Sequence, residues 1–313
     1  MEFRKTRIED IKTFQTFFKN QQNRIFDFTA IGTYMWGKFF EQEFCVDEDI
    51  LYLKYKIFGK KIAFNVPCSD ESRRKKAYCK IRKYCKENNI NLVFKEVTPE
   101  SLQEISEIFP GYEAYADDDW AEYIYSIKDL ATLEGKKFNK KRNHVNKFHQ
   151  LYDGNYELQL LNSTNILDVI KFQEEFLAIK EDQEEVSHIE EFENEMAIEV
   201  LKNFEQFPAI GYVLYVNNEI AAYTIGEVIE NMLFVHIEKA RTDIAGAYNI
   251  INKEFASFIR DRFENVEFVN RSDDAGDLGL RQAKKSYNPI KMLSKYVVEI
   301  DLKYGCCKSE EII

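Results

Sequence analysis

The sequence predicts a mixed α/β protein whose two halves repeat one order of elements. Three observations lead to this prediction. Helical and strand-like patterns alternate along the chain, and the order helices, antiparallel strands, helix, strand, helix, strand occurs twice. The apolar residues, 45% of the 313 residues and including 18 Tyr and 25 Phe, are enough for real cores. The length suits two medium domains, which we place at residues 1–152 and 153–313.

In the first half, apolar residues at helical spacing predict helices at residues 8–20, 28–40, 70–87 and 99–109. Strands are predicted at residues 50–58, 60–67, 92–97 and 121–127. Gly59 separates the first two strands and predicts a hairpin, and the last of the four is expected to close this half.

The second half begins with a strand at residues 156–161, two helices at 166–179 and 184–204, and strands at 210–216, 219–229 and 232–240. Asn217 and Asn218 form the kind of turn that joins hairpin strands. A helix at 247–263, a strand at 266–270, a short cationic helix and a last strand at 292–300 complete this half.

Composition excludes several classes of protein. A formal charge of -11 argues against general polyanion binding. Six Cys without a C-x-x-C pair, together with four His, argue against a metal site and indicate reduced thiols. The N-terminal residues lack a signal-peptide core, and no apolar stretch reaches about 18 residues. We therefore expect a cytoplasmic protein whose membrane contact, if it has any, is peripheral.

Residues 232–240 hold the first candidate site. Strict alternation places Phe234, His236 and Glu238 on one face of the strand. A histidine and a carboxylate two residues apart suit a general acid/base pair. The alternative is that this face is the half-exposed side of a sheet.

The loop after this strand runs from Arg241 to Gly246 and Ala247, and Tyr248 follows in the next helix. A glycine at a helix start allows close backbone approach, and the free N–H groups there favour an anion or an oxyanion. An ordinary helix N-terminus explains the same residues.

Residues 266–296 are the richest in polar chemistry. Asn270, Asp273 and Asp274 follow the strand, and the short helix carries Arg281 and Lys284 on one side. Leu280, Ala283 and Tyr287 are expected on its buried side. This arrangement suits an anionic or esterified substrate. The alternative is an Asp–Arg network that locks the turn, with Asp277 as the helix cap.

Residues 135–152 concentrate positive charge in an otherwise acidic chain. The cations proposed for phosphate binding are Lys136, Lys140, Lys141 and Arg142. RNA, a nucleotide or a lipid headgroup would supply such phosphates. A solvated helix between domains is the alternative.

Three ordered motifs carry a resemblance to a known family: GKKFNKKRNHVNKF, HIEKARTDIAGAYNIINKEF and NRSDDAGDLGLRQAKKSYNP. Together they resemble the C-terminal domain of bacterial phosphatidylglycerol lysyltransferases. The resemblance implies two tandem GNAT-type acyltransferase folds, shared with Fem-type aminoacyltransferases. In those relatives the second fold is catalytic and the donor is an aminoacyl-tRNA.

The resemblance implies a strand carboxylate, here Glu238, or else His236, as the base. The loop at Arg241 departs from the acetyl-coenzyme A pattern Q/R-x-x-G-x-G/A, because Gly246 comes later and the first glycine is missing. An aminoacyltransferase is therefore the leading hypothesis, with aminoacyl-tRNA as co-substrate and no bound cofactor. His236, Glu238 or Asp273 would take the proton, and Arg281 with N–H groups near Gly246 would stabilise the oxyanion.

Two alternatives stay open. One is a coenzyme-A-dependent N-acyltransferase acting on a small amine. The other is a non-catalytic module that binds RNA or an anionic membrane. The acceptor of the transferred group, whether lipid, peptide or small molecule, is not specified by the sequence, and neither is the oligomeric state.

Overall fold

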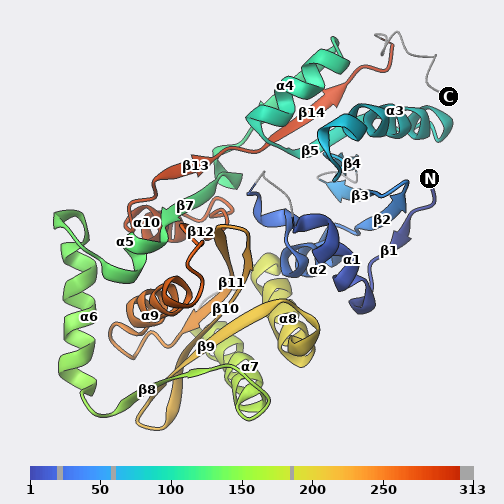
Figure 1. Cartoon of the computed structure of the whole chain (residues 1–313). Coiled ribbons are helices and arrows are strands. Elements are labelled where there is room, and N and C mark those ends of the chain that lie inside the picture. The colour runs from blue at the N-terminus through green and yellow to red at the C-terminus, as the bar shows by residue number, and fades with distance from the viewer. Residues whose placement is uncertain (20–23, 58–60, 184–186, 304–313) are drawn as a thin grey trace.

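Two seven-stranded sheets carry the fold (Figure 1). A computed structural model describes residues 1–19, 24–57, 61–183 and 187–303. The first sheet has the order β1-β2-β3-β4-β5-β14-β6, with β4 and β5 parallel and the other neighbours antiparallel. Its strands are β1 (Arg4–Lys5), β2 (Glu43–Asp47), β3 (Ile50–Ile57), β4 (Lys61–Asn65), β5 (Leu92–Val97), β6 (Tyr112–Ala116) and β14 (Tyr296–Ile300).

The second sheet has the order β13-β7-β12-β11-β10-β9-β8, with β11 and β12 parallel and the other neighbours antiparallel. Its strands are β7 (Glu122–Ser126), β8 (Tyr156–Leu160), β9 (Ala209–Val216), β10 (Glu219–Ile229), β11 (Met232–Ala240), β12 (Phe268–Asn270) and β13 (Lys291–Leu293). Asn217 and Asn218 both have positive φ, 53° and 68°, as the predicted hairpin turn requires.

The α-helices lie close to their predicted positions, except α5, which the sequence did not predict. They are α1 (Ile11–Phe18), α2 (Ala30–Phe39), α3 (Glu71–Glu87), α4 (Pro99–Ile108), α5 (Ile127–Thr132), α6 (Asn139–Tyr152), α7 (Ile166–Gln183), α8 (His188–Lys202), α9 (Ala247–Arg262) and α10 (Leu278–Lys285). Side chains cap several starts, as Asp70 does for α3 and Thr98 for α4. The predicted hairpin of β3 and β4 is confirmed, whereas its turn at Gly59 lies outside the described residues.

The sheets exchange strands, which the sequence did not predict. The strand expected to close the first half, β7, pairs instead with β12 and β13 in the second sheet. The single strand predicted at 292–300 is two strands: β13 joins the second sheet and β14 the first. Sheet membership therefore does not follow the order of the chain, and the domain boundary at residues 152 and 153 stays a prediction.

Both faces of the second sheet are covered by helices (Figure 1). On one face α1, α2 and α8 share a core with β11 that includes Phe28, Ile31, Phe234 and Ile237. On the other face α5, α6 and α9 form a second core. The helices α3 and α4 pack on the first sheet in a third core. The N-terminal helices thus complete the core of the C-terminal sheet.

A bulge in β11 corrects the predicted face pattern. Ile225 pairs with Ile237 and Gly226 with Val235, so His236 is an extra residue on its strand. His236 therefore points toward α2, while Glu238 contacts α9. The prediction that these two side chains share a face is wrong, because one inserted residue reverses the alternation that follows it.

Candidate active site

Tyr287, just after α10, is the centre of the candidate site. Its buried ring lies 3.9 Å from Lys141 Nζ of α6 and 5.2 Å from the guanidinium carbon of Arg271. Asn249, in the first turn of α9, donates its amide N–H to the Tyr287 hydroxyl at 2.7 Å. Burial together with the charge of Arg271 lowers the pKa of Lys141 to about 8. Two cations therefore lie beside one aromatic ring.

A buried ion pair adjoins this ring. Arg271, at the end of β12, donates to Glu238 Oε1 at 2.7 Å, and both side chains are largely buried. Asn252 of α9 donates to Glu238 Oε2 at 3.1 Å. The carboxylate thus has two fixed donors, and the pair joins β11, β12 and α9.

Lys284 lies on the inner side of α10. It is 8% exposed and donates to the backbone oxygen of Asp273. Burial lowers the pKa of Lys284 to about 8. The hydroxyl of Tyr125 donates to the Lys284 backbone oxygen at 2.9 Å, so β7 holds α10 in place.

Arg281 and Asp274 form the locking network that the sequence allowed as an alternative. Arg281 donates to both carboxylate oxygens of Asp274, at 2.7 and 2.9 Å, and to Asp119. Asp274 is fully buried and also accepts from Tyr123 at 2.5 Å. Asp277 caps α10 through the N–H of Leu280. Nε and Nη2 of Arg281 are therefore engaged in holding the corner.

The loop before α9 is partly covered by α6. Gly246 has φ +88°, and an added Cβ would lie 2.8 Å from the His144 backbone oxygen. Ala247 is buried, the ring of Tyr248 is partly exposed, and Arg241 pairs on the surface with Asp243 and Glu219. The backbone of α6 thus lies directly against Gly246.

His236 is enclosed on the opposite face of β11. Its ring lies 4.5 Å from that of Phe26, and neither ring nitrogen has a hydrogen-bond partner. Its Nε2 is 3.7 Å from Glu227, whose carboxylate accepts from the N–H groups of Ala30 and Ile31. Burial lowers the pKa of His236 to about 3 and raises that of Glu227 to about 7.

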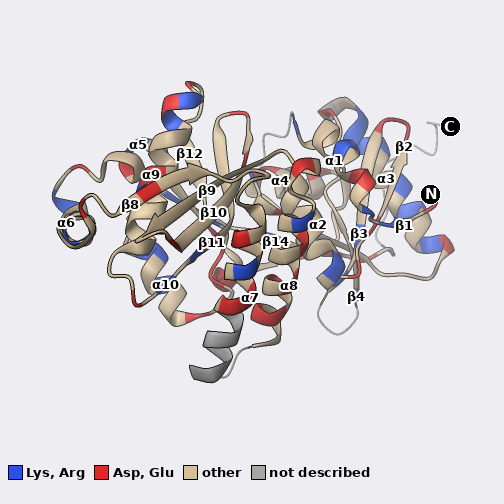
Figure 2. Cartoon of the chain, turned by 90° about the horizontal axis from the view of Figure 1, so that it is seen from below, with Lys and Arg blue, Asp and Glu red and all other residues tan. Residues whose placement is uncertain are grey.

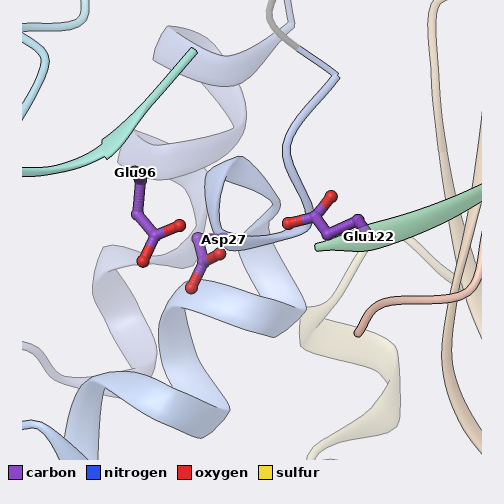
Figure 3. A group of neighbouring side chains, drawn as sticks. All are labelled: Asp27, Glu96 and Glu122. Atoms are coloured by element: carbon purple, nitrogen blue, oxygen red, sulfur yellow. The ribbon is translucent and has the colours of Figure 1, made fainter. Parts of the chain in front are cut away.

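A second buried polar cluster lies where the sheets exchange strands. Figure 3 shows its carboxylates, Asp27, Glu96 and Glu122, converging. The Lys295 ammonium lies 3.0 Å from Asp27, 3.3 Å from Glu96, 3.0 Å from Glu122 and 3.6 Å from Asp273. This arrangement could bind a cation, and the chain's own ammonium already fills that role.

Asn270 belongs to this second cluster. It is fully buried and donates to Glu122 at 2.6 Å and to the Arg24 backbone oxygen at 3.0 Å. Burial raises the pKa of Glu122 to about 7, even though Lys295 acts to lower it. Asn270 thus links β12 to the N-terminal segment and belongs to this cluster, not to the site around Tyr287.

The cations of the basic segment, residues 136–142, differ in exposure and in hydrogen-bond partners. Lys136 and Lys140 are exposed. Arg142 instead bonds to the backbone oxygens of Leu133 and Gly135, so it fastens α6 to the end of α5. In Figure 2, Lys and Arg mark α6, whereas Asp and Glu mark α7 and α8. Lys136, Lys140 and Lys141 are therefore the cations of this group that remain open to a phosphate.

The structure thus brings Glu238, Lys141 and Tyr287 together and leaves His236, Arg241 and Asn270 outside that group. Arg271, Asn249 and Asn252 were not predicted as site residues. The spacing of the two asparagines, three apart on one helix face, is the signal that could have indicated them. Nothing local marked Lys295, because its partners come from four separate segments.

Several solved structures are similar to this chain. A structure of a conserved protein of unknown function from Bacteroides thetaiotaomicron is 32% identical and covers 96% of this chain and 100% of its own, with a TM-score of 0.87. The C-terminal domain of a putative lysylphosphatidylglycerol synthetase from Agrobacterium fabrum is 12% identical over 94% of this chain and 92% of its own, with a TM-score of 0.67. FemX is 10% identical over 97% of this chain and 98% of its own, with a TM-score of 0.60.

An uncharacterized protein of Mycoplasmoides gallisepticum, MYCGA3080, is 24% identical over 180 residues, which are 57% of this chain and 56% of that relative. The chain therefore matches little more than half the length of this curated relative.

The predicted class, a mixed α/β protein with two tandem GNAT-like folds, is confirmed, and the fold is of the acyltransferase type. Among the described residues, no helix is both long and apolar enough to cross a bilayer. A family model matches residues 27–299, and on that match the chain belongs to the family described as phosphatidylglycerol lysyltransferase, C-terminal.

Proposed function

We propose that this chain transfers an aminoacyl group from tRNA to an acceptor amine or hydroxyl, at the cluster around Tyr287. One observation carries the proposal: this cluster joins residues from the four candidate segments of the sequence. Lys141 comes from the basic helix, Glu238 from β11, Asn249 from the start of α9 and Tyr287 from the corner after β12. Segments that are far apart in sequence thus form one polar site near the carboxyl ends of β11 and β12.

The charge of the cluster suits an anionic donor. Lys141 lies close enough to Arg271 for its pKa to fall to about 8 through burial and mutual repulsion. A phosphate or a developing oxyanion beside these groups would relieve that repulsion. The exposed Lys136, in the turn before α6, and Lys140, on α6, extend the positive charge, and the acceptor end of a tRNA would lie there.

The chemistry is an attack on an ester. The acceptor nitrogen or oxygen adds to the aminoacyl carbonyl, and Glu238 takes the proton that the nucleophile loses. Arg271 stabilises the negative charge on the carbonyl oxygen. Collapse of the intermediate breaks the ester, and the proton passes to the ribose oxygen that leaves. His236 has no part in this scheme, because it lies on the other face of β11.

Binding is tested with charged and uncharged tRNA in a mobility-shift titration. Lys136→Glu/Lys140→Glu should weaken binding at least about tenfold and reduce its salt dependence, because each lost phosphate contact reduces counterion release. The matched control is Lys171→Glu/Lys202→Glu, which reverses two exposed charges on α7 and α8. Arg142 is left unchanged because it fastens α6.

Transfer is tested separately with radiolabelled aminoacyl-tRNA and candidate acceptors. Glu238→Gln should lower the transfer rate by about 10²-fold or more while tRNA binding is kept. Unchanged tRNA binding in the Lys136/Lys140 variant would contradict the proposal. Tight, RNA-independent binding of acetyl-coenzyme A in a calorimeter would favour the coenzyme-A-dependent alternative.

A further inference from the structure

Asn252 carries an unpaired hydrogen-bond acceptor inside the candidate site. The residue is 4% exposed, and its Nδ2 donates to Glu238 Oε2 at 3.1 Å. Its Oδ1 is buried as well and has no hydrogen-bond partner among the described residues. A buried amide oxygen without a donor is unfavourable, because it has lost its hydrogen bonds to water and gained none. Such an atom marks a place where a ligand would supply the missing donor.

The Glu238 carboxylate fixes the direction of that amide. An ionised carboxylate only accepts hydrogen bonds, so the –NH2 end of Asn252 must face it and Oδ1 is the unpaired end. Because an amide group is small and planar, Oδ1 lies beside the same carboxylate. The side chains of Glu238 and Arg271 are 9% and 14% exposed, so solvent reaches the edge of the pair. Two acceptors, one charged and one neutral, are therefore neighbours where the proposed nucleophile would lie.

A primary amine matches these two acceptors, whereas an alcohol does not. The nitrogen of a neutral primary amine has two N–H groups and one lone pair. It can therefore donate to Glu238 and to Asn252 while the lone pair attacks the ester. An alcohol has one O–H, which Glu238 takes as the base, and Asn252 Oδ1 then stays unpaired. A secondary amine has the same shortfall, so the site should discriminate against both.

The acidic helix α8 brings negative charge to the same end of the sheet. Lys239, which follows Glu238 on β11, donates to Glu193 of α8 at 3.0 Å. Burial lowers the pKa of Lys284 to about 8, and Glu193 is among the carboxylates that oppose this lowering, so its charge reaches α10. Figure 2 shows Asp and Glu along α8. An amine is an ammonium ion in water near neutral pH, and the charge of α8 would favour its approach.

We infer that the acceptor is a primary amine and that Asn252 selects it over a hydroxyl. The inference rests on the proposed function and names the class of its acceptor. The ammonium form first releases one proton to water. The nitrogen lone pair then forms a C–N bond with the aminoacyl carbonyl carbon, and the C–O bond of the ester breaks. Glu238 takes one N–H proton, which passes to the ribose oxygen, while the other N–H stays on Asn252 Oδ1 and becomes the N–H of the amide product.

Transfer assays with matched acceptors test the inference. Radiolabelled aminoacyl-tRNA is incubated with the full chain and with propylamine, N-methylpropylamine or propanol, and the rate without protein is subtracted. The wild type should prefer propylamine to the other two, and this comparison needs no variant. Asn252→Leu should reduce each preference at least about tenfold, because only propylamine loses a hydrogen bond to Oδ1. The lost bond to Glu238 affects all three acceptors alike, and their intrinsic reactivities cancel between the two proteins.

Asn249→Leu is the matched control, because it removes an asparagine of the same helix whose amide already pairs with Tyr287. It should leave both preferences unchanged even though it lowers the rate. Unchanged preferences in Asn252→Leu would overturn the inference, as would wild-type transfer to propanol as fast as to propylamine. An equal loss with all three acceptors, absent when the aminoacyl group is N-acetylated, would place the donor's α-amino group at Asn252 and overturn it too. In each of these cases transfer itself persists, whereas no transfer to any acceptor would reject the proposed function as well.

Discussion

At the scale of single residues, His236 and Glu238 show that the alternation of side chains along a strand does not always predict which face each one occupies. The strand containing both was predicted correctly, and so was the polar character of its end. The bulge at His236 could not be predicted, because it depends on how Ile225 and Gly226 pair with the neighbouring strand. One unpaired residue then decides which of the two side chains reaches the candidate site.

The burial of His236 makes a testable contribution to stability. Its folded-state pKa, about 3, lies below the ordinary 6.5, so the unfolded chain takes up a proton between these values and the folded chain does not. The free energy of unfolding therefore falls as the pH falls through this window. His236→Phe should flatten that acid dependence and leave the protein at least as stable, because the ring nitrogens have no partners.

Urea unfolding at a series of pH values measures this effect. His144→Phe is the control, since it makes the same change at an exposed histidine. An acid dependence that is unchanged in His236→Phe would show that other groups cause it.

The buried pair of Glu238 and Arg271 predicts non-additive mutations. Removing either partner leaves an uncompensated charge that is largely buried. Arg271→Met and Glu238→Gln should therefore each lower the free energy of unfolding by about 3–5 kcal/mol. The double variant should recover part of that loss, since neither charge then remains. Chemical denaturation of all four proteins gives the coupling free energy. Strictly additive losses would mean that the pair is not coupled.

At the scale of elements, predictability followed the length of the pattern. The strands β9, β10 and β11 were predicted because each has eight or more residues with strong apolar content. The short strand β6 was missed, because all five of its residues are exposed and it shows no alternation. The helix α10 was predicted as a helix, but its ionic contacts, not its apolar residues, set which side faces inward.

The contact between α6 and the start of α9 can be tested with two glycines. Both Gly246 and Gly135 have positive φ, +88° and +86°, so alanine is strained at each. An added Cβ at Gly246 would meet the His144 backbone oxygen at 2.8 Å, whereas at Gly135 nothing lies within 4 Å. Gly246→Ala should therefore cost about 1–3 kcal/mol more than Gly135→Ala.

Thermal or urea unfolding of the two alanine variants measures the difference. Because α6 must move to admit the new methyl group, tRNA binding should weaken in Gly246→Ala and not in Gly135→Ala. Equal losses of stability would show that backbone strain alone, and not helix contact, explains Gly246.

At the scale of the whole molecule, the exchange of strands could not be predicted from local patterns. Residues 292–300 read as one strand, yet β13 and β14 belong to different sheets. What separates the strands is the lysine itself, whose ammonium is drawn into a cluster formed by distant carboxylates.

This cluster ties the two sheets together. Glu96 comes from β5 in the first sheet, and Glu122 from β7 in the second. The Lys295 ammonium lies between them, at the point where the chain crosses from one sheet to the other. The folded-state pKa of Glu122, about 7, is above its ordinary 4.5, so ionisation of this group lowers stability as the pH rises through that window.

Replacing Lys295 with Met should therefore break the link between the sheets in a pH-dependent way. Loss of the ammonium leaves the carboxylates unpaired and should cost about 3–5 kcal/mol. The loss should be larger at about pH 8 than at about pH 5, because the carboxylates can take up protons at the lower pH and so avoid mutual repulsion. Urea unfolding at the two pH values measures it.

Lys61→Met is the matched control, since Lys61 pairs with Glu299 at the partly exposed surface of the first sheet. It should cost at most about 1 kcal/mol at either pH. A loss in Lys295→Met that is equally small, or that does not grow with pH, would mean that apolar packing joins the sheets without help from the cluster. The expected result would instead show that one buried ammonium, on the segment between β13 and β14, holds the two sheets together.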